Sequence, residues 1–205
     1  MKLKYWLTLI FATAAVLFCV TFIMSKNHNP KMSNIEFIPI GKTDRATIEK
    51  FAKEVAGIYG VSYHIAVEPL ELPQDAYDEE RGQYLASVIL EKLNARPETA
   101  NSQVIGVASV DLYEQDMNWI FGLAEMPGHV SVISITRLRP EYWKRGKNEA
   151  LFIKRAVKES VHEIGHTLGL EHCTNDRCVM QFSNSLGYTD YKSENFCKNC
   201  SAKLP

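Results

Sequence analysis

The stretch from His162 to His172 constrains the fold of this chain more than any other, because its spacing predicts both a helix and the end of that helix. At about 100° per residue, His162 and His166 lie roughly 40° apart and therefore share one helix face. Gly169 follows three residues later, and glycine readily adopts the left-handed conformation that ends helices. If the helix continued instead, His172 would lie about 240° around from His166. We therefore expect a helix, a turn at Gly169, and three imidazoles converging on one point.

Three converging imidazoles beside a carboxylate are the side chains that a hydrolytic zinc site needs. Neutral imidazole nitrogen is a good ligand for Zn²⁺, and three protein ligands leave a fourth position open for water, as in catalytic zinc sites. Glu163 directly follows the first histidine. Its carboxylate could take the proton of a zinc-activated water and pass it to a leaving amine. We therefore predict zinc-dependent hydrolysis of a peptide bond, with Glu163 as general base and acid and with His162, His166 and His172 as the ligands of a catalytic zinc.

Four cysteines lie immediately beyond the last histidine, and they are Cys173, Cys178, Cys197 and Cys200. Their sulfurs could ligate a second, structural zinc tetrahedrally, and the Cys-x-x-Cys end is typical of such sites. Two disulfides are the alternative, and they gain weight if this part of the chain is exported. Either arrangement would hold the C-terminal tail against the chain that follows His172.

The extended motif resembles the zinc signature of the metzincin metallopeptidases at every fixed position, from His162-Glu163-x-x-His166 to Gly169-x-x-His172. Within the metzincins, the sequence is similar to the archaemetzincins, in which a cysteine follows the third histidine and a Cys-x-Met and a distal Cys-x-x-Cys come later. The upstream segments that also look like that family are Val110-Asp111-Leu112-Tyr113, Phe121-Gly122-x-Ala124 and Ser134-Ile135-x-Arg137-Leu138.

This resemblance implies a zincin-like fold and a zinc peptidase. It implies that the three histidines of the motif bind the catalytic zinc, that Glu163 is the catalytic residue, and that the four cysteines bind a structural zinc. Met180 would lie in a turn beneath the metal. The strand near Phe121 to Ala124 would form the rim of the cleft, where an extended peptide could pair with its exposed edge.

The rest of the chain alternates between strand and helix patterns, which predicts an α/β fold with a mixed, mostly parallel sheet. The predicted strands cover residues 35–40, 61–67, 104–110, 120–124 and 130–135, and the last two form a hairpin. The predicted helices cover residues 44–59, 83–93 and 148–168, and residues 69–82 form a loop. The last helix is the central, active-site helix, and a cysteine-clamped tail follows it.

The amino terminus has the pattern of a membrane segment. The run from Tyr5 to Met24 is uncharged, is preceded by Lys2 and Lys4, and ends just before Lys26. About 20 apolar residues suffice to span a bilayer, and no small-residue cleavage site follows the run. We therefore expect residues 1–25 to be an uncleaved signal anchor, embedded through residues 5–24. Residues 26–33 would be a linker, and residues 34–205 an extracytoplasmic, archaemetzincin-like metallopeptidase domain. The alternative is a cleaved signal peptide and a secreted domain.

Charge argues against nucleic acid as a partner. The 23 Lys and Arg residues are balanced by 24 Asp and Glu residues, so no broad basic field is expected. The richest basic run is interrupted by Glu149 and Glu159 and is expected to be the solvated part of a helix and its approach. It comprises Lys144, Arg145, Lys147, Lys154, Arg155 and Lys158. The expected partners are therefore a peptide or protein substrate and a membrane.

Two other functions compete with peptide hydrolysis. A membrane-tethered zinc-binding module without catalysis is one of them, but the presence of Glu163 argues against it, since an inactive relative commonly loses the base first. Hydrolysis of a non-peptide amide is the other, and it would use the same site.

Overall fold

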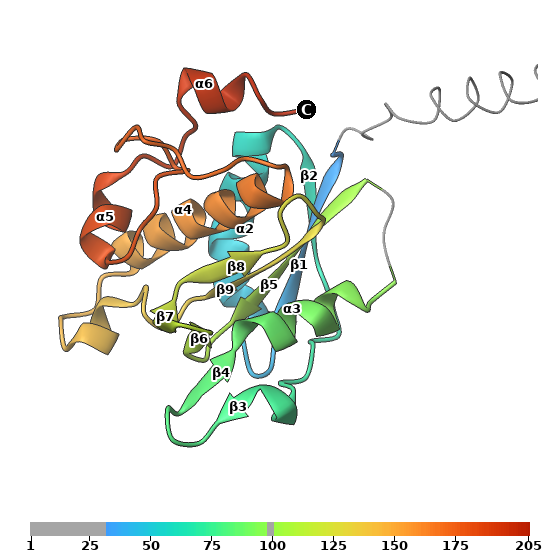
Figure 1. The fold of residues 1–205 in the computed structure, drawn as a ribbon, viewed down its shortest axis with the longest axis vertical. Helices are drawn as coiled ribbons and strands as arrows, with labels where there is room; N and C mark the ends of the chain where they lie inside the picture. Colours follow the sequence, from blue (N-terminus) through green and yellow to red (C-terminus); the bar gives the residue numbers. More distant parts are fainter. Residues whose placement is uncertain (1–31, 98–100) are drawn as a thin grey trace, which may run out of the picture. The chain divides into compact units, whose positions relative to one another are not determined.

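A five-stranded, mostly parallel sheet organises the part of the chain that the computed structural model describes, residues 32–97 and 101–205 (Figure 1). The strand order is β2-β1-β5-β9-β8, and the first three pairs are parallel while β8 is antiparallel to β9. The strands are β1 (Asn34–Ile40), β2 (Ser62–Ile65), β5 (Ser102–Ala108), β8 (Gly122–Ala124) and β9 (Val130–Ser134). The predicted α/β fold with a mostly parallel sheet is confirmed, and so is the hairpin, formed by β8 and β9.

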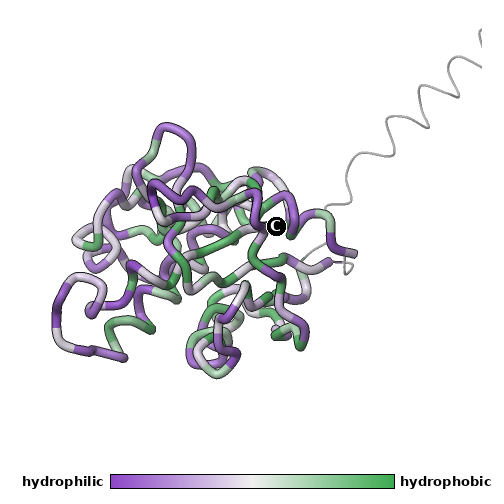
Figure 2. The backbone as a smooth tube through the Cα atoms, turned by 90° about the horizontal axis from the view of Figure 1, so that it is seen from below, coloured by the Kyte–Doolittle hydropathy of each residue, from purple (hydrophilic) through white to green (hydrophobic). Residues whose placement is uncertain are grey.

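Helices cover both faces of this sheet. The helices α2 (Arg45–Tyr59) and α4 (Glu149–Thr167) lie on one face, and α3 (Ala86–Asn94) lies on the other (Figure 1). Successive strand residues point to opposite faces. Accordingly, Phe37 packs in the core beneath α2 and α4, whereas Ile38 packs in the core beneath α3. Figure 2 shows hydrophobic segments of the backbone crossing the interior and largely hydrophilic segments in the outer loops.

A second, four-stranded sheet is the main feature that the sequence interpretation missed. Its order is β3-β4-β6-β7, formed by β3 (Tyr77–Asp78), β4 (Gln83–Leu85), β6 (Leu112–Glu114) and β7 (Met117–Ile120). The predicted loop 69–82 therefore contains β3 and the 3-10 turn η1 (Gln74–Ala76). The predicted helix 83–93 begins three residues late because Tyr84 and Leu85 pair with β6, and because the Gln83 amide donates to Asp111 and to Asn118 O.

The predicted strand 120–124 is also divided between the two sheets. Strand β7 ends at Ile120 and β8 begins at Gly122, so Phe121 marks the change from one sheet to the other. Strand β8 is consequently the short edge strand of the five-stranded sheet. It lies next to α4, which carries the histidine motif (Figure 1).

The predicted solvation of the basic run is wrong where that run enters α4. Arg155 and Lys158 are buried, and so is Glu159. The reason is the helix α5 (Leu186–Tyr191), which packs against this part of α4. Arg155 makes a bidentate ion pair with Asp190, in which Nε and Nη2 each lie 2.7 Å from a carboxylate oxygen. Lys158 Nζ donates to the carbonyl oxygens of residues 189 and 190. Burial of these charges is possible because each of them is paired or hydrogen-bonded.

The remaining elements are short. They are the 3-10 helix η2 (Pro140–Trp143) before α4 and the helix α6 (Lys198–Ser201) near the C-terminus. No helix within residues 32–97 and 101–205 has the length and apolar character needed to cross a membrane. The predicted anchor, residues 1–25, and most of the predicted linker lie outside the described residues.

Candidate active site

The end of α4 and the turn that follows bring three histidines together, which we name the histidine cluster (His162, His166 and His172). The helix ends at Thr167, and Gly169 has a φ of +86°, the left-handed conformation expected for it. The N–H of Leu170 then donates to Gly165 O at 3.0 Å, which closes the turn and directs the chain back toward the helix. One ligand nitrogen from each imidazole lies within 4.8 Å of the others. The structure therefore brings together the three histidines that the motif predicts.

Two of these imidazoles are held in a tautomer that suits a metal ligand. His162 Nδ1 lies 2.8 Å from Val179 O, and His166 Nδ1 lies 2.6 Å from Leu170 O. A carbonyl oxygen only accepts, so each Nδ1 carries the proton and each Nε2 carries a lone pair. These two Nε2 atoms face each other at 3.1 Å. Facing lone pairs repel unless a cation lies between them, and two nitrogens bound tetrahedrally to one zinc at about 2.1 Å lie about 3.4 Å apart.

The surroundings keep the imidazoles neutral. Burial lowers the pKa of His162 well below its usual range and lowers that of His166 to about 4. Burial also lowers the pKa of His172. The buried ammonium of Lys192 lowers the pKa of all three further. Only the neutral ring offers a free lone pair. The lowered pKa values therefore leave the three imidazoles in the form that can bind a divalent cation.

Glu163 lies in the same cleft as the histidine cluster. Its side chain is buried, and this burial raises the pKa of the Glu163 carboxyl well above its usual range. The nearby carboxylate of Glu159 raises it further, while Lys192 opposes the effect. A carboxylate of raised pKa is a stronger proton acceptor, as a general base in a hydrolytic site requires.

A cleft of about 520 Å³ opens in front of these side chains. The strands β7 and β8 form one wall of it, and the residues from Phe182 to Asn184 form another. The Phe182 ring lies 5.0 Å from the imidazole of His172 and is partly exposed. The cleft therefore has room for a segment of a substrate beside the histidine cluster.

Met180 packs against α4 at Gly165, the residue before His166. A Cβ atom at Gly165 would lie only 2.5 Å from Met180 Sδ, so the helix approaches Met180 as closely as a glycine allows. The next residue back, Val179, is the one whose carbonyl accepts from His162. The chain therefore makes a turn at Met180, and the backbone of this turn also orients one of the histidines.

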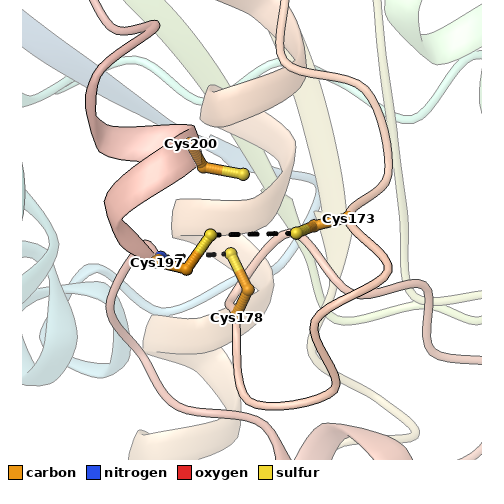
Figure 3. Close-up of side chains that lie close together, drawn as sticks. All are labelled: Cys173, Cys178, Cys197 and Cys200. Atoms are coloured by element: carbon orange, nitrogen blue, oxygen red, sulfur yellow. Dashed lines mark hydrogen bonds between the residues drawn. The ribbon is translucent and has the colours of Figure 1, made fainter.

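The four predicted cysteines form a second group, the cysteine cluster (Cys173, Cys178, Cys197 and Cys200). Figure 3 shows their four sulfurs pointing toward one another. All four lie within 4.8 Å of one another, and the sulfurs of Cys173 and Cys197 are 3.8 Å apart. Four sulfurs bound tetrahedrally to one zinc at about 2.3 Å lie about 3.8 Å apart, whereas a disulfide needs about 2.05 Å. The Cys200 N–H lowers the pKa of the Cys197 thiol to about 7, which favours a thiolate there.

Sequence reasoning missed the buried ion pair behind the site. Lys192 Nζ lies 3.3 Å from Glu159 Oε1, and both side chains are almost fully buried. Glu159 lines the cleft and also accepts from the Thr189 hydroxyl at 3.1 Å. One signal was available, since Glu159 lies four residues before Glu163 and so on the same helix face. Lys192 is distant in the sequence, so no sequence signal indicated that it pairs with Glu159.

Comparisons with known proteins agree with this arrangement. The model of peptidase family M54 matches residues 35–205. The archaemetzincin of Thermococcus kodakarensis is 42% identical over 84% of this chain and 96% of its own length, and that of Methanocaldococcus jannaschii is 39% identical over 81% and 89%.

Solved structures show the same relationship. The archaemetzincin of Archaeoglobus fulgidus, complexed with malonate, superposes with a TM-score of 0.72 at 34% identity, over 83% of this chain and 99% of that one. A zinc-dependent peptidase from Methanocorpusculum labreanum gives a TM-score of 0.75 at 26% identity, over 83% and 100%. The chain therefore belongs to peptidase family M54, the archaemetzincins, and is a zinc metallopeptidase of peptide or protein substrates.

Proposed function

We propose that this chain hydrolyses peptide bonds at a zinc held by His162, His166 and His172, with Glu163 as the general base and acid. The observation that carries the proposal is the pair of Nε2 lone pairs facing each other at 3.1 Å. Each of them is fixed by a bond from the other ring nitrogen to a carbonyl. Such a pair needs a shared cation, and Glu163 lines the same cleft.

The residues of the chain divide the chemistry among them. When bound, zinc supplies a Lewis acid that polarises a carbonyl and lowers the pKa of a coordinated water. Glu163 accepts the proton of the attacking water at its carboxylate and returns it to the leaving amine nitrogen. Glu163 and His162 are both buried and both line the cleft, so the transfer would take place where little of either side chain meets bulk water.

The edge strand β8 supports a peptide as the substrate. Phe121 O accepts from Ser134 N–H, and Glu125 N–H donates to Val130 O, so these residues bond inward to β9. In an antiparallel pair the intervening residues point the other way. The N–H and C=O groups of Gly122 and Ala124 therefore face the open edge beside the cleft, where an extended peptide can add as a further strand.

We further propose that the cysteine cluster binds a second, structural zinc, so that the chain holds two zinc ions. The sulfur separation of 3.8 Å supports this proposal over two disulfides. Neither a non-catalytic binding module nor an amidase of non-peptide substrates has comparable support, since Glu163 is in place and the relatives form a peptidase family.

We also propose that residues 5–24 anchor the protein in a membrane, with the peptidase domain outside the cytoplasm, or that they direct its secretion. The support is the length of the uncharged run. Alkaline washing of isolated membranes tests this proposal, because an anchored chain stays in the pellet. Recovery of the full-length chain in the cytoplasmic fraction would contradict both versions.

The catalytic assignment is tested with the full chain and an unbiased peptide library. Glu163→Gln should reduce turnover by about 10²–10⁴-fold, the usual contribution of a general base, and should leave the zinc content unchanged. The matched control is Glu54→Gln, which changes an exposed carboxylate on α2 and should leave turnover unaltered. Full turnover by Glu163→Gln would refute the role of Glu163, and a wild-type chain that binds zinc but cleaves no peptide would refute the proposed substrate class.

A further inference from the structure

Gly122 lies where the edge strand β8 meets the candidate general base. A Cβ atom built at this position would lie 2.6 Å from both Cγ and Oε1 of Glu163 and 2.7 Å from its Cδ. Cβ atoms essentially never approach other heavy atoms so closely. The backbone itself does not require glycine, because Gly122 is not among the residues with positive φ. The missing side chain therefore serves to make room for Glu163.

The helix that carries Glu163 cannot easily move aside. The Glu163 side chain is 5% exposed, and α4 is buried at the neighbouring positions. Residues 163 and 165 lie about 200° apart on the helix, so Gly165 faces away from β8. There Met180 fills the space that a Gly165 side chain would need. The helix is thus confined between Met180 on one side and β8 on the other, and it cannot retreat from β8 without moving into Met180.

We propose that Gly122 is a positioning residue for the reaction. Its lack of a side chain forms a recess in β8 that holds the Glu163 carboxylate beside the histidine cluster. This inference rests on the proposed role of Glu163, because a recess for that carboxylate matters to turnover only if the carboxylate transfers a proton.

If Gly122 acted by binding the substrate instead, its substitution would change KM. The N–H and C=O groups of Gly122 face the open edge of the sheet, whereas its missing side chain is on the Glu163 side. A methyl group at residue 122 would leave the edge groups in place and displace the carboxylate. The effect should therefore fall on kcat rather than on KM.

The first test is the Gly122→Ala variant of the full chain, compared with Gly57→Ala. No atom lies within 4 Å of a Cβ at Gly57 on α2, so this control adds the same methyl group to open space. Gly122→Ala should lower kcat by about 100-fold, as expected when a catalytic group is displaced by about 1 Å. KM should stay within about twofold, and the zinc content should not change. An unchanged kcat, or an effect confined to KM, would overturn the proposal.

The second test needs no turnover, and so separates this proposal from the proposed function. Gly122→Ala is placed in the wild-type chain and in Glu163→Ala, which lacks the three atoms that the new methyl group would meet. The methyl group should lower Tm, or prevent folding, in the wild-type background only, and Glu163→Ala should rescue it. An equal loss of Tm in both backgrounds would show that residue 122 contacts something else, and the proposal would fail even if the chain is a peptidase. Rescue of Tm without peptide cleavage by the wild type would instead place the failure in the proposed function.

Discussion

The histidine cluster and the cysteine cluster are neighbours in the chain, but the fold supports them in different ways. Two of the three histidines project from α4, a 19-residue helix buried between the sheet and the tail. The cysteines come from a turn, a loop and the four-residue helix α6, with little regular structure between them. The histidine cluster is therefore preorganised by packing, whereas the geometry of the cysteine cluster depends on what the sulfurs bind.

The two clusters are nevertheless connected. Cys178 is followed directly by Val179 and Met180. Val179 O accepts the hydrogen bond from His162, and Met180 packs against α4. Loss of the cysteine cluster should therefore disturb the histidine cluster, but the reverse should not hold. Three variants, compared by the fall in Tm that each causes, test this asymmetry.

The largest fall in Tm is expected for Cys178→Ser. The side chain of Cys178 is 1% exposed, and its loss removes one of four thiolates from the proposed structural zinc. Apparent binding free energies of such zinc ions are about 10–16 kcal/mol in small domains, so Tm should fall by about 10 °C or more. Turnover should be lost as well, because Val179 no longer holds His162. The measurements are thermal unfolding and zinc per chain, which should decrease from two to less than one.

The control for this variant is Cys19→Ser, which changes the fifth cysteine of the chain. It should keep both zinc ions and the parental Tm. Thiol titration of the denatured wild-type chain adds an independent check, since bound zinc leaves the four cluster thiols reactive. If none of these four thiols reacts, the cluster contains disulfides and the structural zinc is refuted.

An intermediate fall in Tm is expected for Lys192→Met. Its ammonium pairs with Glu159 and donates to Gln181 O, with a side chain that has no solvent exposure. Removing one partner of a buried ion pair costs about 3–5 kcal/mol, because the other charge is left uncompensated. Thermal unfolding should show this loss as a fall in Tm, and the second substitution Glu159→Gln should recover part of it. A double variant no more stable than Lys192→Met would show that the ion pair does not determine this effect.

The residues that sequence reasoning identified correctly share one property, which is that their geometry is local. The spacing of His162, His166 and Gly169 allows little besides a helix that ends in a turn, and the predicted helix 148–168 agrees closely with α4, which Asn148 caps. Local geometry also predicted the helix 44–59, which agrees with α2; Asp44 caps this helix, and Gly60 follows it in the left-handed conformation.

The features that sequence reasoning missed depend on distant segments. Strands of two to four residues, such as β3 and β6, are too short to show a periodic pattern, and only their partners stabilise them. Arg155 and Lys158 look like solvated residues until α5 supplies their partners. The role of Gly122 is visible only when α4 is placed against β8, although its motif had been noted.

The smallest fall in Tm is expected for His166→Ala, although this variant should lose all measurable turnover. In zinc-free protein the substitution removes one hydrogen bond, from His166 Nδ1 to Leu170 O, which contributes only about 0.5–1.5 kcal/mol to stability. It also removes the repulsion between the facing Nε2 atoms of His162 and His166, which offsets part of that loss. Stabilisation by bound zinc would obscure this balance, so Tm is compared after exposure to a chelator that empties the histidine cluster. Without chelator, zinc should decrease from two ions per chain to one, because the cysteine cluster keeps its own. If His166→Ala instead lost both zinc ions, or unfolded as readily as Cys178→Ser, the dependence between the clusters would run in both directions, and the histidine cluster would support the tail as much as the tail supports it.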